Sequence, residues 1–95
     1  MNYRSEKLRR AVASLPCTIC GCEGHTQASH SNQQRDGKGM GIKAHDYRIA
    51  AVCDSCHREI DQGSGMTKTE RREAWDEAHR VTIGMLFERG MLEVK

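Results

Sequence analysis

Aromatic residues are scarce in this chain of 95 residues, where they make up 4% of the sequence with one tryptophan and one phenylalanine. A chain of this length fits one domain, 1–95, but a domain so small buries a modest core. With few large apolar side chains, burial alone gives little stability, and small folds of this kind need an additional cross-link. The composition therefore predicts a domain held together by disulfides or by a metal.

Long apolar runs are also missing, and the mean hydropathy is -0.74. No stretch approaches the roughly 20 apolar residues that cross a bilayer, so we expect no membrane insertion. The first ten residues are polar and charged, with no apolar signal segment after them, which favours a reducing cytoplasmic compartment. The net charge of +2, from 15 basic and 13 acidic residues, is too balanced to indicate a nucleic-acid partner by itself.

The hydrophobic pattern predicts an α+β domain with an N-terminal helix and a long C-terminal helix. The expected elements are a helix over 5–14, turns, short strands and an ordered loop over 17–46, a strand over 48–52, and helices over 54–61 and from 67 to about 90. Thr67 and Glu70 have the spacing of a capping box, and Gly90 suits a C-terminal cap. Trp75 on the last helix suits a core or a dimer contact equally well, so the oligomeric state stays open.

Five cysteines occur, and their odd number disfavours a closed set of disulfides. Four of them form two Cys-x-x-Cys pairs, Cys17 with Cys20 and Cys53 with Cys56. Two such pairs can supply the four thiolates of a tetrahedral structural zinc site. Two alternatives remain at this stage, namely buried free thiols and a site in which Cys22 replaces Cys20. Removal of a zinc ion from so small a domain should unfold it.

Histidines and carboxylates near the cysteine pairs predict a second, catalytic site. His57 and Asp61 stand four residues apart in an expected helix, where one face can present both to a divalent cation. His30 lies in the segment between the cysteine pairs, and their closure can bring it opposite His57. A neutral imidazole can remove a proton from water near pH 7. The alternatives are a His57 that only bonds near the cysteines and an ordinary loop histidine at His30.

The glycine-rich segment 33–43 carries the cations Arg35, Lys38 and Lys43, and Arg58 follows His57 directly. Backbone amides and cationic side chains in such a loop can both contact phosphates. The competing interpretation is a flexible surface loop with scattered charges. We expect His25, His45 and His79, which lie outside these patterns, to be solvated or locally bonded.

The order Cys-x-x-Cys, a lone histidine, a glycine-rich loop and Cys-x-x-Cys-His resembles the HNH, or His-Me finger, endonucleases. The likeness is strongest to small prophage-encoded nucleases of the YbcO type, and the phage recombination-promoting nuclease Ref looks related. The residues that carry it are Ser29-His30, the segment 37–43, Asp46, and Cys53-x-x-Cys56-His57-x-x-x-Asp61. The tail, 83–95, is also similar to YbcO-type tails, so the resemblance spans nearly the whole chain.

The resemblance implies a zinc-stapled ββα-metal domain that hydrolyses DNA in phage or prophage recombination or processing, in the cytoplasm of the bacterial host. It implies His30 as the general base and His57 as a ligand of a catalytic Mg²⁺ or Mn²⁺. Asp61 would be a second ligand or face the phosphate, and Asp46 would orient His30 or bind metal. The implied partners are DNA and a recombination protein. The chain has Ser29 where many members have a metal-binding Asp or His, and this favours an alternative, a catalytically silent zinc module that binds DNA or serves as a phage accessory protein.

Overall fold

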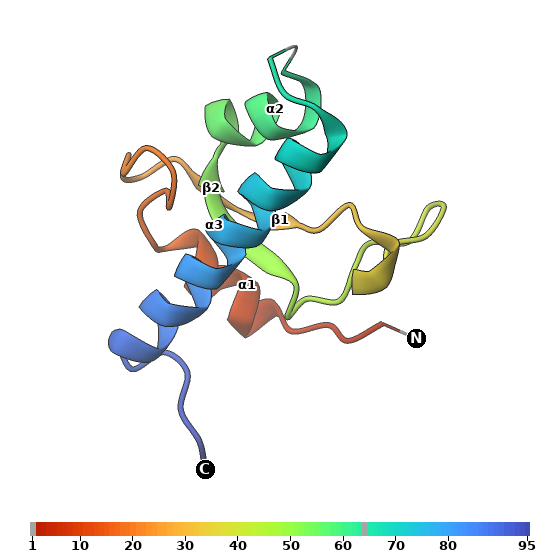
Figure 1. Cartoon of the computed structure of the whole chain (residues 1–95). Helices are drawn as coiled ribbons and strands as arrows, with labels where there is room; N and C mark the ends of the chain where they lie inside the picture. The colour runs from red at the N-terminus through yellow and green to blue at the C-terminus, as the bar shows by residue number, and fades with distance from the viewer. Residues whose placement is uncertain (1, 64) are drawn as a thin grey trace.

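The computed structural model describes residues 2–63 and 65–95, which form three α-helices around one pair of strands (Figure 1). The elements are α1 (Glu6–Ala13), β1 (Thr26–His30), a 3₁₀ turn η1 (Gln34–Asp36), β2 (Ile49–Cys53), α2 (Asp54–Gln62) and α3 (Lys68–Glu88). The predicted α+β class is confirmed, and the helices and the strand before Cys53 lie close to their expected bounds. None of the helices in the described residues has both the length and the apolar character that a bilayer crossing requires.

Strands β1 and β2 pair antiparallel, and their register separates two functional groups. Thr26 lies opposite Cys53 at one end of the pair, and His30 lies opposite Ile49 at the other. Four residues of strand span about 13 Å at roughly 3.4 Å per residue. The cysteine end and the histidine end of this small sheet are therefore separated by the length of one strand.

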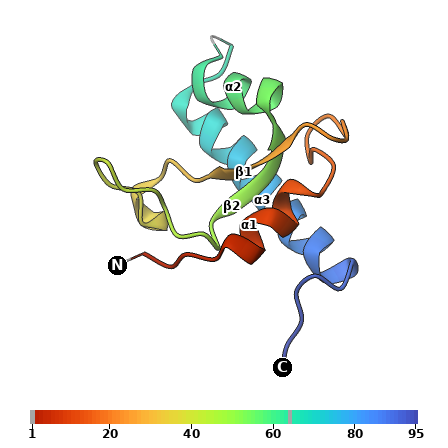
Figure 2. The same cartoon turned by 180° about the vertical axis from the view of Figure 1, so that it is seen from behind.

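All five residues of β2 are buried, because helices cover both of its faces. Ile49 and Ala51 pack with Val12 of α1 and with Leu86 of α3, whereas Ala50 and Val52 pack with Ile60 of α2 and Trp75 of α3. The first cluster consists of Val12, Leu15, Ile49, Ala51 and Leu86. The second consists of Cys17, Ala50, Val52, Cys53, Ile60, Trp75 and Ala78. Figure 1 shows α3 crossing in front of the strands, and Figure 2 shows α1 on the opposite side. Because both faces of β2 are covered, its sequence lacks the alternation of apolar and polar residues that a half-exposed strand shows.

Among the described residues, β1 is the one strand that pairs with β2, and the outer edge of β2 is closed by side chains of α3 and by the first cysteine loop. The amide of Ala51 donates to Oγ1 of Thr82 at 2.9 Å, and its carbonyl accepts from the amide of Thr18 at 2.9 Å. The ring of His79 donates from Nδ1 to the carbonyl of Ile49 at 2.8 Å. Buried backbone groups need such partners, and these bonds fix the edge of β2 to α3 and to the first cysteine loop.

Helix α3 is the longest element, and both of its predicted ends are confirmed. Thr67 accepts a hydrogen bond from the amide of Glu70, whose side chain bonds back to the amide of Thr67. At the other end Gly90 has φ +71, the left-handed conformation that terminates a helix. Trp75 is only 6% exposed, so it belongs to the core of this chain.

Candidate functional site

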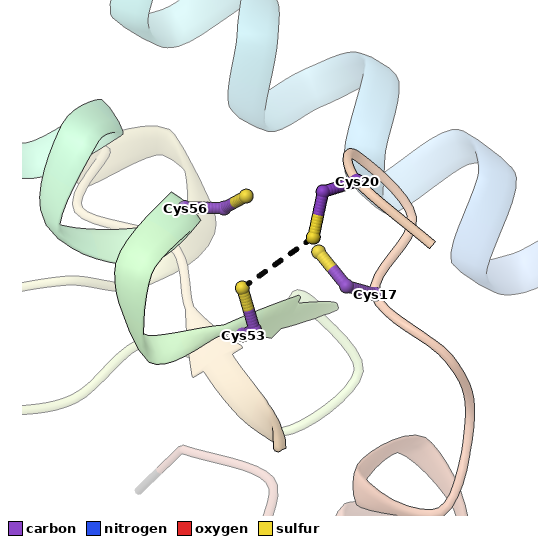
Figure 3. A group of neighbouring side chains, drawn as sticks. All are labelled: Cys17, Cys20, Cys53 and Cys56. Carbon is purple, nitrogen blue, oxygen red and sulfur yellow. Dashed lines mark hydrogen bonds between the residues drawn. The ribbon is translucent and has the colours of Figure 1, made fainter. Parts of the chain in front are cut away.

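The four cysteines of the two Cys-x-x-Cys pairs meet at one end of the sheet (Figure 3). Cys17 and Cys20 belong to the loop after α1, Cys53 ends β2, and Cys56 lies in the first turn of α2. Their sulfur atoms all lie within 4.8 Å of one another, and Sγ of Cys20 is 3.7 Å from Sγ of Cys53. Four thiols in this arrangement can hold a metal ion, so the predicted convergence of the two pairs is confirmed.

The first cysteine loop is shaped by its own backbone. The amide of Cys17 donates to the carbonyl of Cys22, and the amide of Gly21 donates to the carbonyl of Cys17, both at 2.9 Å. Gly21 has φ +78, which residues with a Cβ rarely adopt. The amide of Ile19 points at Sγ of Cys17 from 3.4 Å. A short loop with a left-handed glycine thus turns both sulfurs to one side.

The acidities of the thiols show that this cluster is suited to a cation. Burial opposes ionisation of Cys17, but hydrogen bonds from the backbone amides of Cys20 and Cys53 outweigh it and lower the pKa to about 6. Burial, together with the neighbouring thiol of Cys53, raises the pKa of Cys56. One thiolate therefore forms easily and the next forms with difficulty, because negative charges crowd together. A bound cation removes that repulsion.

Cys22 takes no part in this group. It is exposed, and its thiol lies near the carbonyl of its neighbour Glu23. The alternative in which Cys22 replaces Cys20 is therefore wrong for this fold. All five cysteines are free thiols in this structure.

At the other end of the sheet, His30 is hydrogen-bonded to a buried carboxylate. Nε2 of His30 lies 2.8 Å from Oδ1 of Asp46, which is 0% exposed. The second oxygen of Asp46 accepts from the amide of Ser5 at 2.7 Å and from the guanidinium of Arg9, and Arg4 donates to the first oxygen at 3.1 Å. Both carboxylate oxygens are thus occupied, which favours the orienting role of Asp46 over the metal-binding one.

The charge state of Asp46 determines the tautomer of His30. Burial by itself would raise the pKa of this carboxyl, but the hydrogen bonds from His30, from the Ser5 amide and from a guanidinium lower it to about 2. An ionised carboxylate only accepts hydrogen bonds, so Nε2 of His30 carries the hydrogen. The lone pair of a neutral His30 is then on Nδ1, where it can accept a proton.

The second histidine, His57, is bonded to Asp61 on the same face of α2. Nε2 of His57 lies 2.8 Å from Oδ2 of Asp61, and the side chain of Asn32 donates to Oδ1 at 3.1 Å. A cleft of about 340 Å³, which we call the histidine cleft, is lined by His30, Asn32, Lys38, Lys43, His57 and Asp61 together with neighbouring residues of β1. The fold therefore brings His30, His57 and Asp61 to one surface, whereas Asp46 lies outside that lining.

The four predicted phosphate-contacting residues divide into two groups. Lys38 and Lys43 line the histidine cleft. Arg35 instead pairs with Asp76 of α3 at 2.7 Å, and Arg58 pairs with Asp54 one turn away. Pairing with a carboxylate leaves less positive charge for a phosphate, so the two lysines are the better placed cations.

The glycine-rich loop that carries these lysines is anchored to the rest of the chain. Gly39 and Ile42 bond to each other in both directions, at 3.1 and 3.0 Å. The side chain of Asn2 holds the carbonyls of Gly37 and Lys43, each at 2.8 Å. The loop is thus a small hairpin with hydrogen bonds to the N-terminal segment, in agreement with the expected ordered loop.

The remaining histidines agree only in part with the expectation of solvated or locally bonded rings. Nδ1 of His45 accepts from the amide of Tyr3 at 3.0 Å, and its ring stacks on Tyr47. His79 stacks on Trp75 in addition to its bond with β2. Both are hydrogen-bonded to residues far away in the sequence and lie outside the histidine cleft, whereas His25 is exposed.

Sequence reasoning missed the residues that support the site. Arg4, Ser5 and Arg9 hold Asp46 from about 40 positions away, and Asn32 fixes Asp61. No spacing rule relates an N-terminal arginine to a distant aspartate. The only signal was an excess of cations in the first ten residues beside a helix start, which also fits an ordinary solvated surface.

The histidine cleft offers fewer metal ligands than the cysteine cluster does. In residues 2–63 and 65–95, the cysteines are the only group of three or more His, Cys, Asp or Glu side chains close enough to share an ion. His57 and Asp61 offer two ligand atoms. Ser29, at the position where the resembling family often has a ligand, is 3% exposed and its hydroxyl has no hydrogen-bond partner among the described residues.

Comparison of the chain with protein-family models, with curated proteins and with solved structures finds no match. The functional interpretation therefore depends on the geometry of the cysteine cluster and of the histidine cleft, and on the resemblance of the motifs.

Proposed function

We propose that this protein is a metal-dependent endonuclease of the HNH type, which hydrolyses DNA phosphodiester bonds with a structural zinc and a histidine base. One observation carries the proposal: His30, which is hydrogen-bonded to Asp46 behind it, and the His57–Asp61 pair line one cleft together with two lysines. The strand–strand–helix order of β1, β2 and α2 agrees with it. The motif resemblance supports a role in phage or prophage recombination or processing, with DNA and a recombination protein as partners.

Zinc is the metal that best fits the four cysteines. Tetrahedral zinc has Zn–S bonds of about 2.3 Å, which places neighbouring sulfurs about 3.8 Å apart. The sulfurs of Cys20 and Cys53 are already 3.7 Å apart, and the widest separation in the group is within 4.8 Å. An all-thiolate set also favours zinc over harder cations such as Mg²⁺.

His30 supplies the general base in this mechanism. Nδ1 accepts a proton from a water molecule while Nε2–H remains bonded to the carboxylate of Asp46. The imidazolium formed in this step is stabilised by that buried negative charge, and Arg4 and Arg9 keep the carboxylate in place. Lys38 and Lys43 attract the phosphate to the same cleft and offset its charge as hydroxide approaches.

His57 and Asp61 are the residues that would hold the catalytic cation. Mg²⁺ is commonly bound through one or two carboxylates, with water and substrate phosphates completing its shell, so a site with few protein ligands fits Mg²⁺ or Mn²⁺. When bound, such an ion supplies charge stabilisation to the phosphate and the leaving oxygen.

Plasmid nicking in the presence of Mg²⁺ or Mn²⁺ tests this proposal. We expect His30→Ala and His57→Ala each to lower the cleavage rate by about 10²- to 10⁴-fold, the range for loss of a general base or a metal-dependent group. His25→Ala is the matched control, since His25 is an exposed histidine outside the cleft. Equal cleavage by all four proteins would assign the activity to a contaminating nuclease and remove both histidines from the mechanism.

The second candidate function is a zinc module that binds DNA without cutting it. Ser29 in the place of a family ligand and the incomplete second metal site favour this candidate. Binding that weakens steeply with salt, because phosphate contacts release counterions, combined with no cleavage under any of Mg²⁺, Mn²⁺, Ca²⁺ or Zn²⁺, would support it over the endonuclease.

A further inference from the structure

The histidine cleft continues into a second hollow that carries its own cations. Asn32 and Asp61 line the histidine cleft and also line a neighbouring cleft against α3. This neighbouring cleft overlaps a further hollow, and the two have Asn32, Gln33, Lys68 and Arg72 in common. We call these four residues the α3 furrow. A chain lying in the histidine cleft can therefore pass over Asn32 into the α3 furrow without leaving the surface.

The cations of the α3 furrow differ in what they already bind. Arg71, which also lines this region, donates to the carbonyls of Asp61 and Gly63 and so ties α3 to the end of α2. Lys68 and Arg72 are exposed and make no hydrogen bond or ion pair with any of the described residues, 2–63 and 65–95. Their charges are therefore available to a ligand, while Arg71 has a structural role.

The positions of Lys68 and Arg72 are unfavourable for the isolated helix. They stand four residues apart on one face, where like charges repel. They also lie in the first two turns of α3, at the positive end of the helix dipole, where acidic residues are preferred. Neither position contributes to the core. A local cost of this kind, without a compensating contact inside the protein, is typical of a functional surface.

We propose that the α3 furrow is a second phosphate-binding site, in which Lys68 and Arg72 hold the backbone of the nucleic-acid strand beyond the phosphate placed in the histidine cleft. The ligand class is a phosphodiester backbone, because the two free cations are accompanied by neutral amides from Asn32 and Gln33. Trp75, the ring that lines one of the two hollows, is only 6% exposed and already stacks on His79, so it offers no open face to a base. This inference rests on the proposed nucleic-acid function and adds the direction in which the strand leaves the site.

The test measures binding of a fluorescein-labelled 20-base-pair DNA duplex by anisotropy between 50 and 200 mM salt, in a His30→Ala background that leaves the probe intact. The variant is the double substitution Lys68→Gln with Arg72→Gln. The matched control is Arg89→Gln with Lys95→Gln, which removes the same charge at and beyond the C-terminal end of α3. We expect the double variant to bind about tenfold more weakly and to lower the salt slope by about 1 to 2.

The melting temperature of each protein separates a binding role from a structural one. We expect it to stay the same or to rise in the Lys68, Arg72 variant, because a like-charge pair at the positive end of α3 is removed. Equal loss of affinity in variant and control, or no loss in the variant, would show that the α3 furrow is not a phosphate-binding site, while leaving the endonuclease proposal intact. Absence of duplex binding by the His30→Ala parent, together with no cleavage by the wild-type chain, would instead overturn the proposed function itself.

Discussion

The two ends of the β1–β2 pair use different means to hold their functional groups. At the cysteine end, four side chains of one type come from two tight local turns and need only an ion at their centre. At the histidine end, an imidazole is held by a buried carboxylate, which is itself held by two arginines and a backbone amide from the N-terminal segment. The first arrangement is built from local turns and can hold a metal ion, and the second is long-range and depends on hydrogen bonds.

This contrast predicts which amino-acid substitutions the protein can tolerate. The cysteine end joins the loop after α1 to β2 and α2, so its loss should release the whole fold. The histidine end lies outside the two hydrophobic clusters of the core. Changes there should lower activity and part of the stability but leave the metal in place.

The largest expected effect is that of Cys53→Ser, which removes one sulfur from the cluster. Structural zinc sites contribute roughly 10 to 16 kcal/mol of apparent binding free energy, comparable to the whole stability of a small domain. We expect this variant to lose bound zinc and its helical circular dichroism signal together, and a chelator should have the same effect on the wild-type chain.

Cys22→Ser is the matched control for that experiment, since Cys22 is an exposed cysteine outside the cluster. It should retain one zinc per chain by elemental analysis and the melting curve of the wild type. A folded, metal-free Cys53→Ser protein would show that the hydrophobic core alone suffices and would remove the distinction between the two ends.

The next effect concerns Asp46→Asn at the histidine end. The folded-state pKa of Asp46 is about 2, below its ordinary value of 3.8. A carboxyl with a lowered pKa stabilises the fold above pH 4, and this contribution disappears as the pH falls from about 4 through 2. The shift corresponds to about 2 kcal/mol at neutral pH. We therefore expect Asp46→Asn to lower the free energy of unfolding by about that amount and to keep its zinc.

Urea denaturation of the wild type and of Asp46→Asn from pH 7 to pH 3 measures this effect. Acid also protonates the cysteine thiols, so the two proteins are compared only at pH values where both are still folded, and there the difference between them isolates Asp46. That difference should be constant down to about pH 5 and, while both proteins remain folded, shrink as the pH falls further toward 2. A difference that is absent at pH 7, or loss of zinc from Asp46→Asn at neutral pH, would contradict the separation of the two ends.

The smallest effect is expected from Thr67→Ala, which removes the N-cap of α3 without touching either end of the sheet. Loss of a threonine cap costs about 1 kcal/mol, or roughly 4 to 8 °C in melting temperature for a domain of this size. Thr69→Ala, an exposed threonine inside the same first turn, is the control and should melt like the wild type. Equal melting of the two variants would mean that the capping box does not contribute to stability.

Much of the fold could be predicted because its signals are local. Pro16 after an amphipathic turn, the capping box of Thr67 and Glu70, and the two Cys-x-x-Cys pairs each act within a few residues. The meeting of the two pairs was predictable as well, because two Cys-x-x-Cys pairs can supply the four ligands of one metal ion. The core position of Trp75, which the pattern left open, was decided by the cover that α3 gives to β2.

The histidine cleft was predictable only in part. His57 and Asp61 share a helical face by periodicity, and their pairing follows from the sequence. The bond between His30 and Asp46 does not follow from the sequence, because it joins the end of a strand to a loop 16 residues later. The arginines that hold Asp46 come from the N-terminal segment, about 40 positions before it. The approach of Lys68 and Arg72 to the same surface is likewise a result of packing.

The sequence by itself determined the elements, the cysteine ligands and the need for a cross-link, because these depend on neighbours along the chain and on the small number of large apolar residues. Only the tertiary structure decided that His30 is held by a buried Asp46, that its cleft contains two of the four expected cations, and that the cleft continues along α3. The physical reason is that β-sheet register and helix packing join residues separated by tens of positions, and no local pattern records which of them will meet.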